Sequence, residues 1–247
     1  MFDDKLKKIK NESFYFKTLP NQLLKLLKFY FRLEVENAHH VPKKGPAVII
    51  ANHSGFSGLD ALMLNHVLVS EVKRIPRVLT HKLWFSTDFT QKTAQKMGFY
   101  EANYDNGLQF LKRKHVVVIF PEGEDGNFKS SRKMYTLQEF KRGFLRMAIE
   151  TQSPIVPVLV IGAEETNFTL KKLTMKMVFK GLKLPLPLNL IPLPAKWKIV
   201  FMEPIYLPYD QTILDDHTFI REIASDIQEL MQERMHDEIK KRGSVYF

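Results

Sequence analysis

The chain has no cysteine among its 247 residues. This excludes disulfide bonds, cysteine nucleophiles, enzyme-bound cysteine thioesters and cysteine-ligated zinc sites. Acidic residues are also few, with 27 Asp and Glu against 37 Lys and Arg, which leaves a net charge of +10 and a pI near 9.5. So basic a protein is expected to have an acidic partner, either nucleic acid or an anionic membrane surface.

The first residues do not resemble a secretory leader. Met1–Lys5 carries acids where a signal peptide carries bases, and no cleavable apolar core follows. We therefore expect a cytoplasmic protein. Hydrophobic residues make up 45% of the chain and charged residues 26%, which predicts an ordinary globular domain with one sizeable core.

Three apolar runs predict buried strands, and each is followed by polar or glycine-rich residues. They are Ala47–Ala51, His115–Phe120 and Pro154–Ile161. Because ligands gather at the carboxyl ends of parallel strands, the loops after these runs are expected on one edge of a sheet. Other patterns predict helices over Asp60–Val69, Thr90–Lys96, Asp105–Lys112, Leu137–Ala148 and His217–Lys241, and a strand over Arg77–Thr80. The sequence thus predicts an α/β fold with a mostly parallel central sheet flanked by helices.

The loop after the first run contains one histidine and one aspartate, His53 and Asp60. Gly55 and Gly58 lie between them and allow the chain to fold back, so that the carboxylate can reach a ring nitrogen. A histidine held by an aspartate is a general base, because the carboxylate fixes the tautomer and leaves the other nitrogen to accept a proton. Ordinary turn chemistry is the alternative interpretation of the same residues.

The spacing of residues does not fit a serine-hydrolase motif or a zinc site. Gly55–Leu59 resembles a serine-hydrolase elbow, but Leu59 stands where that motif needs glycine. The eight histidines show no spacing with Glu or His that indicates zinc. We therefore expect no metal and no resident cofactor.

From about Val41 to about Pro208 the chain resembles the glycerolipid acyltransferase family, which includes lysophospholipid and 1-acylglycerol-3-phosphate acyltransferases. The resemblance rests on Asn52–His53 through Asp60, Gly98 with the residues after it, Phe120–Gly123 and Ile155–Val158, in that order. It implies that His53 is the general base, that Asp60 is its partner, and that Glu122 with Gly123 belongs to an acceptor-binding loop.

The resemblance also implies the reaction. A hydroxyl of a lysophospholipid or related lipid would attack an acyl thioester supplied by acyl-CoA or acyl carrier protein, which is a substrate in either case. Backbone N–H groups of the Gly55–Gly58 loop or near Gly123 are candidates for stabilising the oxyanion. Contacts with substrate are expected from Asn52, Ser54, Gly55, Gly58, Glu122, Gly123, Lys129 and Arg142.

The chain departs from the family pattern in two ways. Six residues separate His53 and Asp60, where four are commonest. Tyr104 and Glu124–Asp125 stand where the family usually has an Arg and a Thr-Arg pair, so two arginines expected to contact an acceptor phosphate are missing. Nearby cations that could replace them are Lys129, Arg132, Lys133, Lys141 and Arg142. The identity of the acceptor is therefore left open.

Two basic and apolar segments predict contact with a membrane surface. In the first, a helix capped by Asn21 carries a stripe of Lys25, Lys28 and Arg32 on an otherwise apolar surface. Its bases recur too often for a membrane-spanning helix. In the second, Thr166–Met202 has no acid and seven lysines, and its Leu182–Pro194 stretch has too many prolines for a helix. Packing of each segment on the protein itself is the alternative.

We therefore predict an amphipathic membrane-interface segment over residues 1–40 and an acyltransferase domain over residues 41–247, peripheral on the inner face of the membrane. A non-catalytic, lipid-binding relative of the same fold is the alternative, and only His53 with Asp60 separates the two. No nucleic-acid partner is expected, because the chain has no recognisable binding module.

Overall fold

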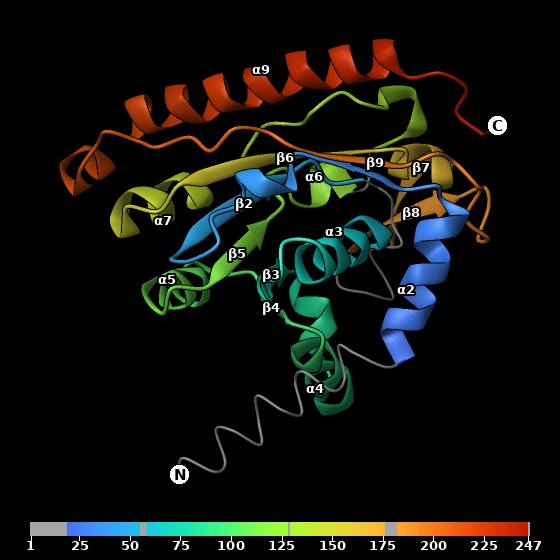
Figure 1. Cartoon of the computed structure of the whole chain (residues 1–247), viewed down its shortest axis with the longest axis horizontal. Coiled ribbons are helices and arrows are strands. Elements are labelled where there is room, and N and C mark those ends of the chain that lie inside the picture. The colour runs from blue at the N-terminus through green and yellow to red at the C-terminus, as the bar shows by residue number, and fades with distance from the viewer. Residues whose placement is uncertain (1–18, 55–57, 128, 176–181, 247) are drawn as a thin grey trace.

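The computed structural model describes residues 19–54, 58–127, 129–175 and 182–246. Its main sheet has seven strands in the order β1-β9-β6-β2-β5-β3-β4 (Figure 1). These strands are β1 (Glu34–Glu36), β2 (Ala47–Ala51), β3 (Pro76–Thr80), β4 (Phe99–Glu101), β5 (Val116–Ile119), β6 (Ile155–Ile161) and β9 (Lys198–Phe201). The helices are α2 (Leu19–Tyr30), α3 (Leu59–Ser70), α4 (Asp88–Lys96), α5 (Tyr104–Lys112), α6 (Glu124–Asn127), α7 (Gly143–Thr151), α8 (Ala163–Thr166) and α9 (His217–Lys241).

Five neighbouring strands of the sheet, β6, β2, β5, β3 and β4, run parallel. β9 is antiparallel to β6, and β1 runs parallel to β9. The predicted fold class, a mostly parallel sheet flanked by helices, is confirmed. The three apolar runs form the neighbouring strands β6, β2 and β5, and the predicted helices and strands in the rest of the domain agree with the structure to within two residues, apart from those discussed below.

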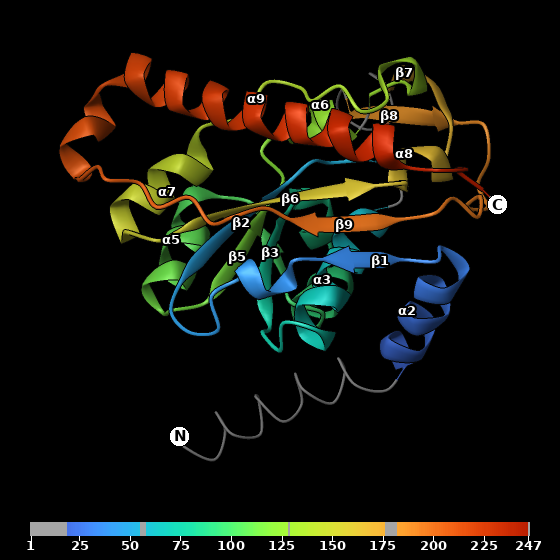
Figure 2. The same ribbon diagram turned by 45° about the horizontal axis from the view of Figure 1, so that its top comes forward.

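Helices cover both faces of the sheet (Figures 1 and 2). Alternate residues of β2 point to opposite faces, as strand geometry requires. Ile49 belongs to a core shared with α3 and α4, whereas Val48 and Ile50 belong to a core shared with α5, α7 and α9. All seven side chains of β6 are buried, as expected for a strand covered on both faces.

The N-terminal helix begins earlier than predicted. α2 starts at Leu19, so Asn21 lies inside the helix and is not its cap. Pro20 explains the difference, because proline is well tolerated in the first turn of a helix, where its missing N–H is not needed.

The same helix also ends earlier than its apolar pattern suggests. Its last residue is Tyr30, and Arg32 follows with a left-handed φ of 46° while the N–H of Leu33 donates to the carbonyl of Lys28 at 2.9 Å. Phe31 and Leu33 are thereby turned into the core. Because β1 then pairs with β9 directly after this turn, residues 34–36 belong to the main sheet. The boundary between residues 40 and 41 stays a prediction.

The helix predicted over Leu137–Ala148 is only partly present, since α7 begins at Gly143 and the residues before it are irregular. Several of their backbone N–H groups donate to side chains of other segments. Leu137 N–H donates to Gln232 Oε1 at 2.8 Å, and Phe140 N–H donates to Gln228 Oε1 at 3.1 Å. Leu137 and Phe140 are buried as the apolar spacing predicts, but in an irregular segment that packs with α9.

The proline-rich stretch forms a strand followed by an exposed turn. β8 (Leu182–Pro187) pairs antiparallel with β7 (Thr169–Met175) in a separate two-stranded sheet. Prolines are tolerated there because each strand of such a pair has a free edge. Beyond β8, the side chains of Leu188, Leu190 and Ile191 are 63%, 79% and 79% exposed.

Candidate active site

His53 and Asp60 lie where β2 passes into α3, and their side chains are in contact. His53 Nδ1 lies 2.6 Å from Asp60 Oδ2. The imidazole packs on the ring of Phe120, with 4.4 Å between ring centroids, and its side chain is 16% exposed. Within the described part of the chain Nε2 has no partner. One ring nitrogen is therefore held by a carboxylate while the other is left for a ligand.

The Asp60 carboxylate is fully buried and accepts hydrogen bonds at both oxygens. Oδ2 also accepts the N–H of Ser54, and Oδ1 accepts the N–H of Ala61, each at 2.8 Å. Asp60 stands in the first turn of α3, where the helix dipole favours a negative charge. Because both carboxylate oxygens accept backbone N–H groups, we assign the hydrogen shared between His53 and Asp60 to Nδ1 of His53.

Glu122 connects the loop after β5 to the loop after β2. Its side chain is fully buried. Oε1 accepts the backbone N–H of His53 at 2.9 Å, and Oε2 accepts that of Gln138 at 2.7 Å. Gly126 in α6 allows this burial, because a Cβ there would lie 2.5 Å from the Cβ of Glu122. Glu122 therefore holds the backbone of the histidine loop.

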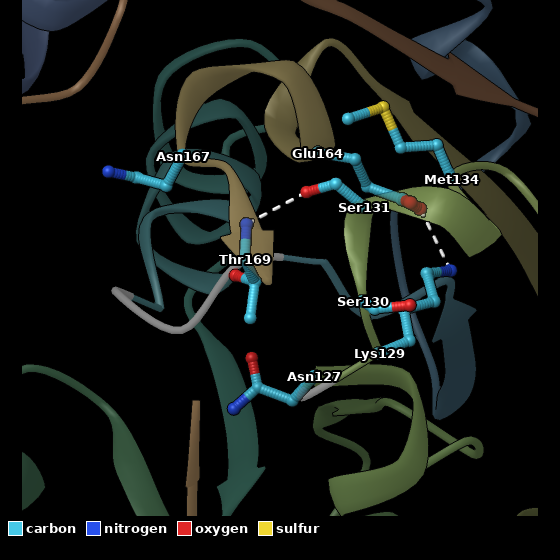
Figure 3. Close-up of a pocket in the computed structure, with 8 residues that line it drawn as sticks. All are labelled: Asn127, Lys129, Ser130, Ser131, Met134, Glu164, Asn167 and Thr169. Carbon is cyan, nitrogen blue, oxygen red and sulfur yellow. Dashed lines mark hydrogen bonds and ion pairs between the residues drawn. The ribbon is translucent and has the colours of Figure 1, made fainter. Parts of the chain in front are cut away.

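A second buried carboxylate, Glu164 in α8, follows β6 on the same edge of the sheet. Lys129 Nζ lies 2.8 Å from Glu164 Oε1, an ion pair drawn in Figure 3. The same Nζ lies 3.8 Å from Glu122 Oε2, so Lys129 stands between the two carboxylates. Glu164 Oε2 accepts the N–H of Tyr135 at 2.9 Å. One network of buried charged side chains thus connects the loops that follow the three predicted strands.

Burial raises the pKa of Glu164 to about 7, against the opposing effect of Lys129. The folded protein therefore holds this proton more tightly than the unfolded chain, where the carboxyl titrates near 4.5. The free energy of unfolding should accordingly fall as the pH rises from about 4.5 to about 7, by about 3 kcal/mol at most. Urea unfolding across this pH range measures the change. Glu164→Gln should remove this part of the slope, and an unchanged slope in the variant would contradict the assignment.

Two predicted contact residues, Asn52 and Ser54, are buried in the structure. The Asn52 amide exchanges two hydrogen bonds with the backbone of Val160, at 2.9 and 2.7 Å, and so extends the pairing of β2 with β6. The Ser54 hydroxyl oxygen is buried and has no hydrogen-bond partner in the described regions. A contact between either residue and a substrate stays a prediction.

The three predicted glycines occupy different settings. Gly55 lies outside the described residues. Gly58 precedes α3 with a left-handed φ of 67°, and Gly123 has a φ of 58°, conformations that other residues adopt only with strain. A Cβ on Gly123 would also lie 2.8 Å from Lys141 Nζ.

The two predicted cations also differ in setting. Lys129 is 8% exposed and belongs to the carboxylate network described above. Arg142 is exposed and stands at the N-cap of α7.

Of the residues missing from the predicted site, Glu164 could have been found, because it follows the third apolar run. The sequence could not indicate that Gln138 belongs to the site, because this residue contacts Glu122 through its backbone N–H and not through its side chain.

Over the described ranges, no helix is both long and apolar enough to cross a membrane. The described residues also contain no cluster of three or more His, Asp or Glu side chains suited to a metal ion.

Comparisons with known proteins agree with this architecture. Residues 32–161 match a protein-family model described as Acyltransferase. An uncharacterized protein of Mycobacterium tuberculosis is 32% identical over 233 residues, covering 89% of this chain and 65% of its own length. The chain therefore spans just under two thirds of that relative. Human 1-acyl-sn-glycerol-3-phosphate acyltransferase alpha is 29% identical over 154 residues, or 54% of this chain and 47% of its own.

A solved structure shares the fold. The crystal structure of the 1-acyl-sn-glycerophosphate (LPA) acyltransferase PlsC from Thermotoga maritima aligns with a TM-score of 0.51 at 16% identity. The alignment covers 86% of this chain and 81% of that one. Because the family model matches more than half of the sequence and includes His53, Asp60 and Glu122, this chain belongs to the acyltransferase family.

Proposed function

We propose that this protein transfers a fatty acyl group from a thioester, carried by CoA or acyl carrier protein, to a hydroxyl of a lysophospholipid or related lipid. The observation that carries the proposal is the 2.6 Å contact between His53 Nδ1 and Asp60 Oδ2, which leaves Nε2 as a proton acceptor. Family membership and the acyltransferase named among the relatives support the reaction class.

In the proposed reaction the acceptor hydroxyl attacks the thioester carbonyl carbon as Nε2 of His53 takes its proton. The Asp60 carboxylate stabilises the imidazolium that results. As the tetrahedral intermediate collapses, the carbon–sulfur bond breaks, and the leaving thiolate takes the proton from the imidazolium. The products are an ester and a free thiol. Backbone N–H groups of the Gly55–Gly58 loop or near Gly123 remain our candidates for binding the oxyanion, although the N–H of Gly123 itself donates to the carbonyl of Phe120 at 3.0 Å.

The direct test uses the full chain with radiolabelled acyl-CoA and acyl carrier protein thioesters. Acceptors are a panel of lysophospholipids, glycerol phosphate and neutral alcohols, with products separated by lipid chromatography. We expect a labelled ester from at least one pair of substrates. Protein that is inert with every pair would contradict the proposal and favour a non-catalytic, lipid-binding relative.

We further propose that the protein docks on an anionic membrane through one apolar edge, formed by α2 and residues 188–191. Its exposed side chains are Leu23, Leu26, Phe29, Leu188, Leu190 and Ile191. The Tyr30 hydroxyl donates to the carbonyl of Pro192 at 2.7 Å, which joins the two segments. Figure 1 shows α2 on the side of the molecule that carries the β7–β8 pair.

This apolar edge adjoins the strand ends that carry the site. The N–H of Leu193 donates to the carbonyl of Thr166, the last residue of α8, at 2.8 Å. The N–H of Phe168 donates to the side chain of Asn189 at 2.9 Å. Because α8 follows β6, a bilayer on the apolar edge would lie beside the strand ends that carry the site. This position suits an enzyme that takes its acceptor from the membrane.

Charge adds less to docking than the sequence alone indicates. Of the predicted stripe, Lys28 pairs with Glu71 at 2.7 Å, and Arg32 donates to the carbonyls of Pro194 and Tyr246. Lys25 is exposed. Insertion of apolar side chains is therefore the main contribution that we propose, with the net charge of +10 favouring the anionic inner face.

Leu190→Asp combined with Ile191→Asp should weaken binding to anionic vesicles by about 100-fold, since each side chain loses about 1.5 kcal/mol of burial in lipid. Both residues are 79% exposed, so folding should be unaffected. Vesicle sedimentation measures the loss. Leu230→Asp, on an exposed leucine of α9, is the control. If the double variant binds like this control, the apolar edge is not the docking surface.

A further inference from the structure

We propose that Lys141 binds a phosphate group of one of the two substrates beside His53. The inference rests on the proposed function and deepens it, because it names the residue that selects a phosphate-bearing acceptor or donor. The sequence offers several cations in this region, and only their placement in the fold separates them.

The ammonium group of Lys141 lies over the loop that supports the histidine. A Cβ built on Gly123 would be 2.8 Å from Nζ and 3.3 Å from Cε of Lys141. Gly123 directly follows Glu122, whose carboxylate binds the backbone N–H of His53 at 2.9 Å. Lys141 therefore brings a positive charge to the same edge of the sheet as the imidazole.

The backbone that carries Lys141 is held firmly. Its own N–H donates to the carbonyl of Pro121 at 2.9 Å. The preceding residue, Phe140, is held by Gln228 of α9, and Gln138 is held by Glu122. The base of the lysine side chain is thus fixed against the site loop, while its long stem can adjust to a ligand.

The charge of Lys141 is available for binding. Its side chain is exposed, and no described carboxylate lies within ion-pair distance of it. Lys129, by contrast, is buried against Glu164. The nearby Glu124 is paired with His81 at 2.8 Å. An unpaired ammonium over a catalytic loop suits a phosphate, which it binds as a point charge.

The test measures binding with soluble probes, so it needs no turnover. Isothermal titration of the full chain compares glycerol 3-phosphate with glycerol, and coenzyme A with pantetheine. Lys141→Gln should weaken binding of one phosphate-bearing probe by about 10- to 100-fold, and Lys141→Arg should retain most of it. Loss for glycerol 3-phosphate assigns the acceptor phosphate, whereas loss for coenzyme A assigns the donor.

Lys44→Gln is the control, because Lys44 is exposed and stands just before β2, at the end of that strand opposite to the site. Unchanged binding of both phosphate-bearing probes in Lys141→Gln, or a loss equal to that in Lys44→Gln, would overturn the proposal. If acyl transfer is observed, KM for the phosphate-bearing substrate should rise by the same factor while kcat changes little. Failure of the acyl-transfer assay alone leaves the binding result intact, so the two proposals fail separately.

Discussion

Replacing His53 with alanine is expected to lower kcat for acyl transfer by about 10²- to 10⁴-fold, the usual contribution of a positioned general base. The ring is 2.6 Å from Asp60 and is the proton acceptor in the proposed reaction. Its removal leaves donor and acceptor binding in place, so KM should change little. Initial rates at saturating donor and acceptor, with the substrate pair found active, measure the effect.

Two variants sharpen this test. His39→Ala removes an exposed histidine outside the site and should keep full activity. Asp60→Asn should lower kcat by a similar factor to His53→Ala, because an amide cannot accept from Nδ1, Ser54 and Ala61 together. Full turnover in His53→Ala would end the general-base mechanism.

The parts of the fold that could be predicted are those with strong local signals. The apolar runs of β2, β5 and β6 read as buried strands because both faces of each strand are covered. The loops after these strands were expected at one edge of the sheet, because the carboxyl ends of parallel strands lie together and ligands bind there. The long helix α9 was predicted with its observed bounds, because its apolar residues recur at helical spacing along one side.

Features that depend on distant contacts could not be predicted. Leu137 and Phe140 have helical spacing, but their backbone N–H groups donate to Gln232 and Gln228 of α9 and the segment is irregular. Glu122 was expected in an acceptor-binding loop, but nothing in the local sequence indicated that its carboxylate accepts the backbone N–H of His53. Lys129 likewise gave no sign of its pairing with Glu164. In each case the interacting residue lies on another element, so the local sequence does not indicate the contact.

Because the Glu122 carboxylate is directed into the protein, its removal is expected to lower the stability of the domain strongly. Glu122→Ala should reduce the free energy of unfolding by about 3–5 kcal/mol, because it leaves the part-buried N–H groups of His53 and Gln138 without their acceptor and removes one buried carboxylate from beside Lys129. Urea unfolding measures the loss. Glu139→Ala, on an exposed glutamate of the same segment, should change stability by no more than about 0.5 kcal/mol.

Glu122→Gln separates positioning from stability. Glutamine keeps one acceptor oxygen, but its amide group must face the N–H of either His53 or Gln138, so the stability loss should be smaller, about 1–3 kcal/mol. Assayed at a temperature where the variant is folded, kcat should still fall with little change in KM, because the histidine loop has lost its support. Wild-type kcat in folded Glu122→Gln would show that Glu122 stabilises the domain without positioning His53. A fall in kcat would instead show that the catalytic apparatus includes, besides His53 and Asp60, the carboxylate that holds the backbone of the histidine loop.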